Sequence, residues 1–137
     1  MIPKFRAWNT FHNKWVKHFY ITENGLIYNM EQLHRDLIGA VPIEQSGLIV
    51  MQSTGRFDTF RQDELFEDDV ILWTYFDEWE DSGNARIVYR DGCWKLLDVK
   101  TGKEVWDSLF DCLENCSVYL AGNIYENHEL MEVLDEK

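Results

Sequence analysis

Carboxylates gather around Trp79, in the stretch W-T-Y-F-D-E-W-E-D at residues 73–81. Such a cluster could bind a hard cation through its oxygen atoms, and alternating carboxylates on a rigid scaffold could also imitate the charge of nucleic acid. The stretch lacks the glycine-spaced loop of a calcium-binding hand. We therefore interpret residues 77–84 as a solvated acidic loop, with cation binding and nucleic-acid mimicry as the open alternatives.

The cysteines and histidines are the other side chains that could do chemistry. Cys112 and Cys116 would share one face of a helix, but they lack the C-x2-C spacing of common zinc sites. The total of three cysteines is odd and forms no regular disulfide framework. No nucleophile elbow, dinucleotide-binding pattern or phosphate-binding loop occurs near any of the four histidines or elsewhere. We therefore expect reduced thiols, no zinc or other metal, no cofactor, and no enzymatic activity.

The beginning of the chain is basic although the whole chain is acidic. Four cations precede the first acid, interleaved with the aromatic residues Trp8 and Trp15; they are Lys4, Arg6, Lys14 and Lys17. Such a segment could form a platform for nucleic acid, or it could be an edge strand that its cations protect against aggregation. The net charge of −12 opposes approach to a phosphate backbone. We favour the edge strand and keep the four cations as candidate nucleic-acid contacts.

Strand-like runs and turn signals fill most of the chain. Asn24-Gly25 and Asp91-Gly92 each separate two such runs and predict tight hairpins. Residues 69–76 are apolar on both faces, which predicts a strand near the centre of a sheet. Residues 15–21 also predict one strand, whereas the polar residues 56–66 predict an ordered loop.

Helical spacing appears in two places, at residues 106–116 and after Asn127, whose side chain suits an N-cap. The chain is therefore expected to be mainly β, with two short helices. Short strands bury little unless their sheet curls, so a small, strongly bent barrel is the expected architecture.

The final helix carries an apolar stripe that needs a cover. The stripe consists of Leu130, Met131, Val133 and Leu134. It lies opposite the acidic side chains of Glu129, Glu132 and Glu136. The helix is therefore expected to dock onto its own barrel or onto a neighbouring subunit, and we take the four apolar residues as candidate oligomer contacts.

Five stretches in this order and spacing resemble the YopX family of phage and prophage proteins. They are K-F-R-A-W (4–8), M-Q-S-T-G (51–55), E-L-F-E-D-D-V-I (64–71), R-I-V-Y-R-D-G-C-W-K-L (86–96) and G-N-I-Y-E-N-H-E-L-M (122–131). The resemblance implies a phage- or prophage-encoded intracellular protein, an SH3-like β-barrel core and self-assembly. It implies no established enzymatic activity, so it supplies no catalytic residue.

Three positions depart from the pattern of the family. Ser53 stands where the family usually has Tyr, and His128 stands where it commonly has Pro. Asp68 stands at a position that is usually Gly. If the backbone there needs a positive φ, Asp tolerates it better than most residues and less well than Gly.

A chain of 137 residues is expected to form one domain. We predict a single YopX-like domain over residues 1–137, in which an N-terminal β segment of about 1–50 packs with a barrel-like part, 51–137. No apolar run is long enough to cross a membrane, and the expected location is the cytoplasm of a bacterial host cell. We expect a homo-oligomer that acts by binding, with a host or phage protein as a further partner that the sequence does not name.

Overall fold

The computed structural model describes residues 4–32, 39–75 and 78–127, with residues 78–81 described by their backbone. The chain divides into two compact units, unit 1 (residues 1–52) and unit 2 (residues 53–137). Each unit has its own buried core, and each is described by itself. The packing of the two parts against each other stays a prediction.

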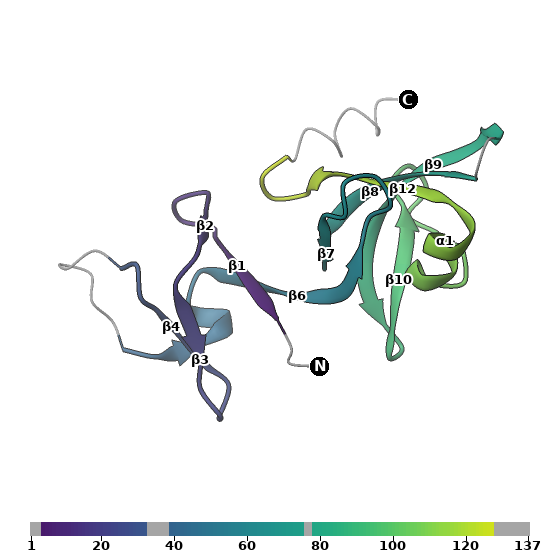
Figure 1. The fold of residues 1–137 in the computed structure, drawn as a ribbon. Coiled ribbons are helices and arrows are strands. Elements are labelled where there is room, and N and C mark those ends of the chain that lie inside the picture. Colours follow the sequence, from purple (N-terminus) through teal and green to yellow (C-terminus); the bar gives the residue numbers. More distant parts are fainter. Residues whose placement is uncertain (1–3, 33–38, 76–77, 128–137) are drawn as a thin grey trace. The chain divides into compact units, whose positions relative to one another are not determined.

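Unit 1 is built from short antiparallel strands. Strand β1 (Phe5–Asn9) pairs with β2 (Lys14–Val16) on one side and with the start of β6 (Leu48–Phe57) on the other. A second sheet has the order β3 (Phe19–Ile21), β4 (Leu26–Asn29) and β5 (Val41–Pro42), followed by the short 3-10 helix η2 (Ile43–Gln45). Figure 1 traces these elements. Their common core consists of Ala7, Val16, Ile27 and Leu48.

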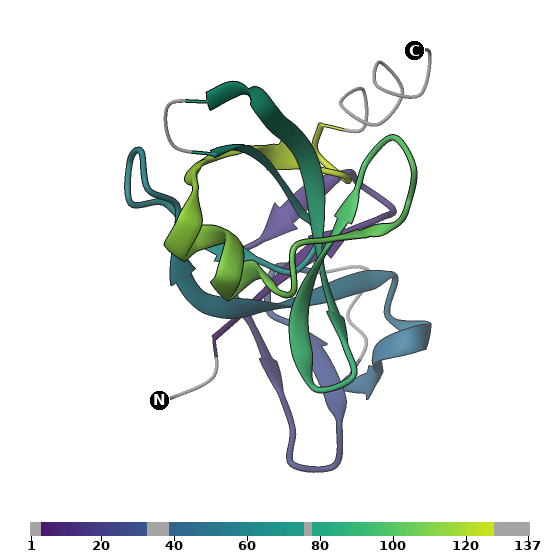
Figure 2. The ribbon, with the colours of Figure 1, turned by 90° about the vertical axis from the view of Figure 1, so that its right-hand side faces the viewer.

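Unit 2 is a curled sheet with one helix. The second half of β6 pairs with β7 (Glu64–Phe66), with a bulge between Ser53 and Arg56. A five-stranded antiparallel sheet follows, in the order β11 (Glu104–Val105), β10 (Cys93–Asp98), β9 (Glu78–Arg90), β8 (Asp69–Tyr75) and β12 (Ser117–Asn123). Helix α1 (Leu109–Asn115) lies beside the bending strands, shown in yellow-green in Figure 2. The sheet curls into a half-barrel.

The core of unit 2 joins the sheet to the helix. Ile71, Ile87 and Leu96 of the sheet are fully buried together with Leu109 and Cys112 of α1. The sequence predicted a helix that begins at Trp106, but helix α1 begins at Leu109. Trp106 has a φ of +63°, which a helix cannot include, and Ser108 caps the helix by accepting a hydrogen bond from the Asp111 N–H at 3.1 Å.

The mainly β class is confirmed, and so are both predicted hairpins. Gly25 and Gly92 adopt φ of +83° and +74°, the left-handed conformation that tight hairpin turns favour. The SH3-like architecture stays a prediction. The predicted helix after Asn127 falls outside the described residues, as do its candidate oligomer contacts Leu130, Met131, Val133 and Leu134.

Three predicted segments are corrected by the structure. The expected acidic loop is wrong for residues 78–84, because this backbone forms the start of β9 and pairs with β8. The expected loop at 56–66 contains the end of β6 and the whole of β7. The expected single strand at 15–21 is interrupted at Lys17 and His18, so it forms parts of two different sheets.

Candidate functional site

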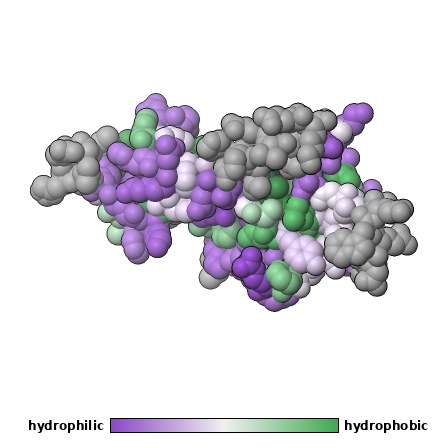
Figure 3. Space-filling model, turned by 90° about the horizontal axis from the view of Figure 1, so that it is seen from above, coloured by the Kyte–Doolittle hydropathy of each residue, from purple (hydrophilic) through white to green (hydrophobic). Residues whose placement is uncertain are grey.

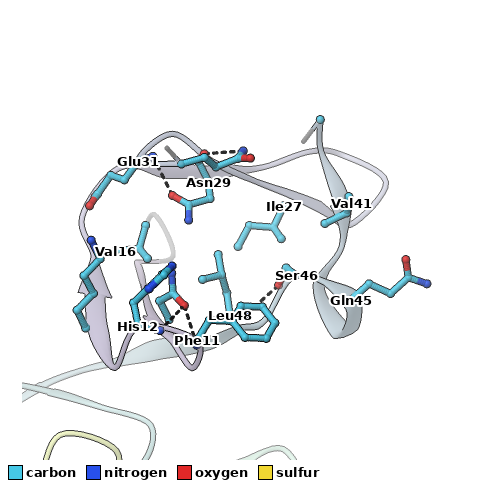
Figure 4. Close-up of a pocket in the computed structure, with 14 residues that line it drawn as sticks. Phe11, His12, Val16, Ile27, Asn29, Glu31, Val41, Gln45, Ser46 and Leu48 are labelled. Atoms are coloured by element: carbon cyan, nitrogen blue, oxygen red, sulfur yellow. Dashed lines mark hydrogen bonds between the residues drawn. The ribbon is translucent and has the colours of Figure 1, made fainter. Parts of the chain in front are cut away.

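Unit 1 contains a pocket of about 500 Å³ between the β1–β2 turn, β4 and β5. Its floor is made by Val16, Ile27 and Leu48, whose side chains converge on the middle of the pocket in Figure 4. All three are at least 95% buried, so the floor is part of the core of the unit. The other described lining residues are Asn9, Phe11, His12, Lys14, Asn29, Glu31, Gln32, Gly39, Val41, Gln45 and Ser46.

One wall is held by the β1–β2 turn. Asn9 Oδ1 accepts hydrogen bonds from the backbone N–H groups of Phe11 and His12, at 2.9 and 3.2 Å. Thr10 donates to the Gly47 carbonyl from both its backbone N–H and its hydroxyl, at 2.9 and 2.7 Å. The Phe11 ring then lies against the bare backbone of Gly47. The β1–β2 turn is thereby fixed to the start of β6.

The opposite wall is held by two side chains, one at the end of β4 and one just after it. Glu31 Oε2 accepts hydrogen bonds from the N–H groups of Lys17 and His18, at 2.5 and 2.7 Å. Asn29 Oδ1 accepts one from the Glu31 N–H at 2.8 Å. The Glu31 carboxylate therefore ties the segment between β2 and β3 to the end of β4, and backbone donors stabilise part of its charge.

The hydroxyl of Ser46 is also engaged in holding the backbone. It donates to the Ile43 carbonyl at 2.6 Å and accepts from the Leu48 N–H at 3.0 Å. The side chains of Asn9, Asn29, Glu31 and Ser46 thus shape the loops around the pocket. What the pocket offers to a ligand is an apolar floor with Lys14 and His12, both exposed, at its rim. Such a site suits the binding of an apolar group with an anionic neighbour.

The candidate nucleic-acid contacts do not share one face of the β1–β2 hairpin. The guanidinium carbon of Arg6 lies 4.5 Å from the centroid of the Trp15 ring, and Trp15 packs edge-on against Trp8 at 4.9 Å. Lys14 pairs with Asn9 one residue further along the hairpin, and both line the pocket. Because side chains alternate between faces of a strand, Lys14 and Trp15 lie on opposite faces. Lys4 and Lys17 are exposed.

A second candidate surface lies on unit 2. A shallow groove is lined by Arg56, Phe57, Phe110 and Leu113 together with polar residues of the 58–62 loop. The Arg56 guanidinium carbon lies 3.8 Å from the centroid of the Phe110 ring. Phe57, Phe60 and Phe110 are 48%, 64% and 44% exposed. Hydrophobic residues also reach the surface on the right-hand side of Figure 3, where unit 2 lies, whereas hydrophilic residues dominate the face of unit 1 in that view.

Asn123 at the end of β12 and Tyr125 just after it contact the Asp68 turn of unit 2. Asp68 has a φ of +70°, so the positive φ considered for this position is present. Its carboxylate accepts hydrogen bonds from Arg86 Nη2 at 2.9 Å and from the Tyr125 hydroxyl at 3.2 Å. Asn123 Nδ2 donates to the Asp68 carbonyl at 3.2 Å. Burial and the charge and hydrogen bond of Asp68 raise the pKa of Tyr125 to about 12.

The cysteines and acids are arranged as follows. Cys112 and Cys116 are both buried in the core of unit 2, and burial raises the pKa of each thiol. Cys93 is half-buried. Among the described side chains, those of residues 4–32, 39–75 and 82–127, no three of the His, Cys, Asp and Glu types come together as a metal-ion site would require. In the same residues no helix has the length and apolar composition needed to cross a membrane.

Sequence reasoning located only Lys14 among the pocket residues. The floor residues lie on three different strands and are indistinguishable, one by one, from ordinary half-buried strand positions. The available signal was the pair of asparagines at strand ends, Asn9 and Asn29, since Asn there often bonds the backbone two residues on.

Comparison with known proteins places this chain in the YopX family. The model of the family described as YopX protein matches residues 4–132, so the chain belongs to that family. No curated protein matches the sequence.

Two solved structures share the fold. Protein EF1440 from Enterococcus faecalis aligns with a TM-score of 0.64 and 23% identity, over 96% of this chain and 99% of its own. The yopX protein from Bacillus subtilis aligns with a TM-score of 0.60 and 16% identity, over 93% of this chain and 94% of its own. Similarity at these identities concerns the fold alone.

Proposed function

We propose that this YopX-family protein acts by binding and self-assembly rather than by catalysis, inside a bacterial cell. The observation that carries the binding role is the pocket of unit 1, whose floor is apolar and whose hydrogen-bonding side chains hold its own loops. Nucleophiles and bases need free, aligned groups, whereas a recognition pocket needs apolar surface and a few charges at the rim.

The assembly role rests on apolar residues that need a cover. The sequence after Asn127 has the stripe of Leu130, Met131, Val133 and Leu134, and unit 2 exposes three phenylalanines around its groove. Burying one Leu or Met stabilises a contact by ~1.5–3 kcal/mol, whereas an exposed ion pair contributes ~0–1 kcal/mol. The apolar stripe therefore dominates the proposed assembly, and an SH3-like core in unit 2 would provide a rigid support for it.

Light scattering after size exclusion tests this function. The wild type is expected to elute as a homo-oligomer, and Leu130→Asp combined with Leu134→Asp is expected to elute as a folded monomer. Circular dichroism reports whether the variant is folded. Glu132→Ala with Glu136→Ala, on the polar side of the same segment, is the matched control and should leave the oligomer intact. A variant that stays folded and oligomeric would remove the stripe from the assembly.

A role with nucleic acid is the alternative, and the exposed cations Lys4 and Lys17 beside the Arg6–Trp15 pair are the observation that favours it. Two features weigh against it. Trp8 is only 6% exposed and so offers no face for a base, and Lys14 lies on the pocket side of its hairpin. The acidic residues 77–81 keep the related proposal, mimicry of nucleic acid, open.

A further inference from the structure

We propose that the pocket of unit 1 is the docking site for the C-terminal segment, residues 128–137, of a second copy of the chain. The proposal rests on the self-assembly put forward above and names the two surfaces that meet. The pocket supplies an apolar floor with the Lys14 cation at its rim, and the segment supplies an apolar stripe flanked by acids.

The shape and chemistry of the pocket suit aliphatic anchors. Its volume of about 500 Å³ and its floor of Val16, Ile27 and Leu48 match the dimensions and composition of sites that bury apolar groups. Residues spaced as Leu130, Val133 and Leu134 are the i, i+3 and i+4 anchors with which an amphipathic helix enters a hydrophobic groove. The stripe therefore has the pattern that the pocket requires.

The charges at the two surfaces are complementary. Lys14 and His12 line the pocket and are exposed, and the carboxylate of Glu31 accepts two backbone hydrogen bonds. The C-terminal segment carries acids on both sides of its stripe. Because most of the protein is acidic, this segment would be repelled by most other surfaces, and the rim of the pocket is one of the few places that attract it.

A second copy is the favoured source of the segment because the sign of the charge differs between the two ends of the chain. It begins with cations and ends with acids, so the start of one copy matches the end of the next. Such a contact joins two different surfaces, and repetition closes into a ring when the rotation between copies allows it. A short connection holds the segment to its own unit 2, since Asn127 bonds Asn123 through both its backbone N–H and its side chain.

Photo-crosslinking of isotopically mixed chains tests the proposal. Leu134 is replaced by p-benzoylphenylalanine in the full chain, and the protein is unfolded and refolded as an equal mixture of ¹⁴N and ¹⁵N forms. After irradiation, mass spectrometry identifies the joined peptides. The expected products link light to heavy chains and join residue 134 to peptides within residues 9–16, 27–32 or 41–48. The same photo-reactive residue at Glu132, on the polar side, should give few such products.

The outcomes separate this proposal from the proposed function. If the particle is oligomeric by light scattering, two results would overturn the docking site alone. One is crosslinks confined to single chains, and the other is crosslinks between copies that fall on the groove of Phe57 and Phe110. A particle that is monomeric by light scattering would overturn the self-assembly as well.

A charge exchange gives a second, independent test. Lys14→Glu should raise the protein concentration at which the oligomer dissociates by ~fivefold, because an attraction becomes a repulsion. Asp135→Lys, next to the apolar stripe, should restore it when it is combined with Lys14→Glu in the same chain. Lys17→Glu is the matched control, since this exposed cation does not line the pocket. An equal effect of Lys14→Glu and Lys17→Glu would overturn the site.

Discussion

Asp68 combines a left-handed backbone with a carboxylate that two other side chains share. Arg86 and Tyr125 both donate to that carboxylate, and only 7% of the residue is exposed. A glycine would suit the backbone better and would leave both donors without this acceptor. Compared with glycine, aspartate at this position therefore gives up an easier backbone conformation and gains an ion pair and a hydrogen bond.

Substitutions at this position should separate the two effects. Asp68→Ala and Asp68→Gly both remove the carboxylate, but only Ala must force a Cβ into a φ of +70°. We expect Asp68→Ala to be the less stable variant by about 1 kcal/mol, as measured by urea unfolding. Equal stabilities of the two variants would show that the backbone at this turn relaxes freely.

Asp58 is a buried carboxylate that holds a loop of unit 2 to β12. It is 2% exposed and accepts hydrogen bonds from the N–H groups of Asp63 at 2.9 Å and Leu120 at 3.0 Å. Burial alone would raise its pKa, but the bonds from Leu120, Asp63, Arg61 and Gln62 outweigh burial and lower the pKa below the ordinary value of 3.8. The charged form is therefore favoured by folding.

The lowered pKa of Asp58 predicts a pH dependence of stability. A group with a depressed folded pKa stabilises the protein fully above its unfolded pKa, and this contribution is lost as the pH falls through the folded pKa. At pH 7 we expect Asp58→Asn to lower the free energy of unfolding by about 1–3 kcal/mol, because a buried donor loses its acceptor. The difference from wild type should narrow as the pH falls below 3.8.

Urea unfolding at a series of pH values measures that difference. Asp63→Asn on the same loop is the control, since its side chain is 45% exposed and should change the stability by less than about 0.5 kcal/mol. A difference between wild type and Asp58→Asn that grows toward acid pH would contradict the assigned role of the carboxylate.

At the scale of elements, the turn between β1 and β2 depends on a glycine outside it. Gly47 has a φ of +75°, and a Cβ built on it would overlap the ring of Phe11. Phe11 is 74% exposed, so its ring can move aside. A larger residue at position 47 would therefore disturb the wall of the pocket as well as the backbone.

Gly47→Ala should destabilise unit 1 more than Gly25→Ala. Gly25 has a similar φ of +83°, but nothing lies within 4 Å of the Cβ built there, so its variant measures the backbone cost alone. That cost is ~1–2 kcal/mol for a left-handed residue. The additional loss in Gly47→Ala should disappear in the Phe11→Ala background. Unfolding followed by tryptophan fluorescence measures all four variants, and an identical loss in both backgrounds would exclude the ring contact as its cause.

The elements that the sequence predicts well are those that local chemistry decides. Asn24-Gly25 and Asp91-Gly92 predict hairpins because few other residues accept the left-handed turn. The beginning of β9 was missed because its acidic sequence has poor strand propensity, and only pairing with the apolar strand β8 makes it extended. Gly83 in this strand leaves space that the Trp73 ring occupies, a contact that no local pattern contains.

The candidate site was largely hidden from the sequence for the same reason. The pocket is assembled from the β1–β2 turn, β4, β5 and the start of β6, which are up to about forty residues apart in the chain. Lys14 was found because its charge is conspicuous in an acidic protein. Lys14 and Arg6 lie on opposite faces of the hairpin because Lys14 pairs with Asn9. This register is a property of the folded sheet that the sequence does not reveal.

At the scale of the whole molecule, the net charge governs encounters with nucleic acid. A charge of −12 opposes binding to duplex DNA at physiological salt, and the cations of the N-terminal hairpin point to two faces. We expect no sub-micromolar binding to random duplex or single-stranded oligonucleotides by fluorescence anisotropy. Tight binding that weakens steeply with salt and is abolished by charge reversal at Lys4, Arg6, Lys14 and Lys17 would make the alternative function the correct one.

The mass of the wild-type protein in solution tests the central claim, self-assembly through apolar contacts, most directly. Sedimentation equilibrium over a wide range of protein concentrations should give a multiple of the 16.4 kDa chain mass. Raising the salt from about 0.1 to about 1 M should loosen the particle only slightly, because salt screens exposed ion pairs and leaves apolar burial in place. A mass of 16.4 kDa at every concentration would contradict the claim.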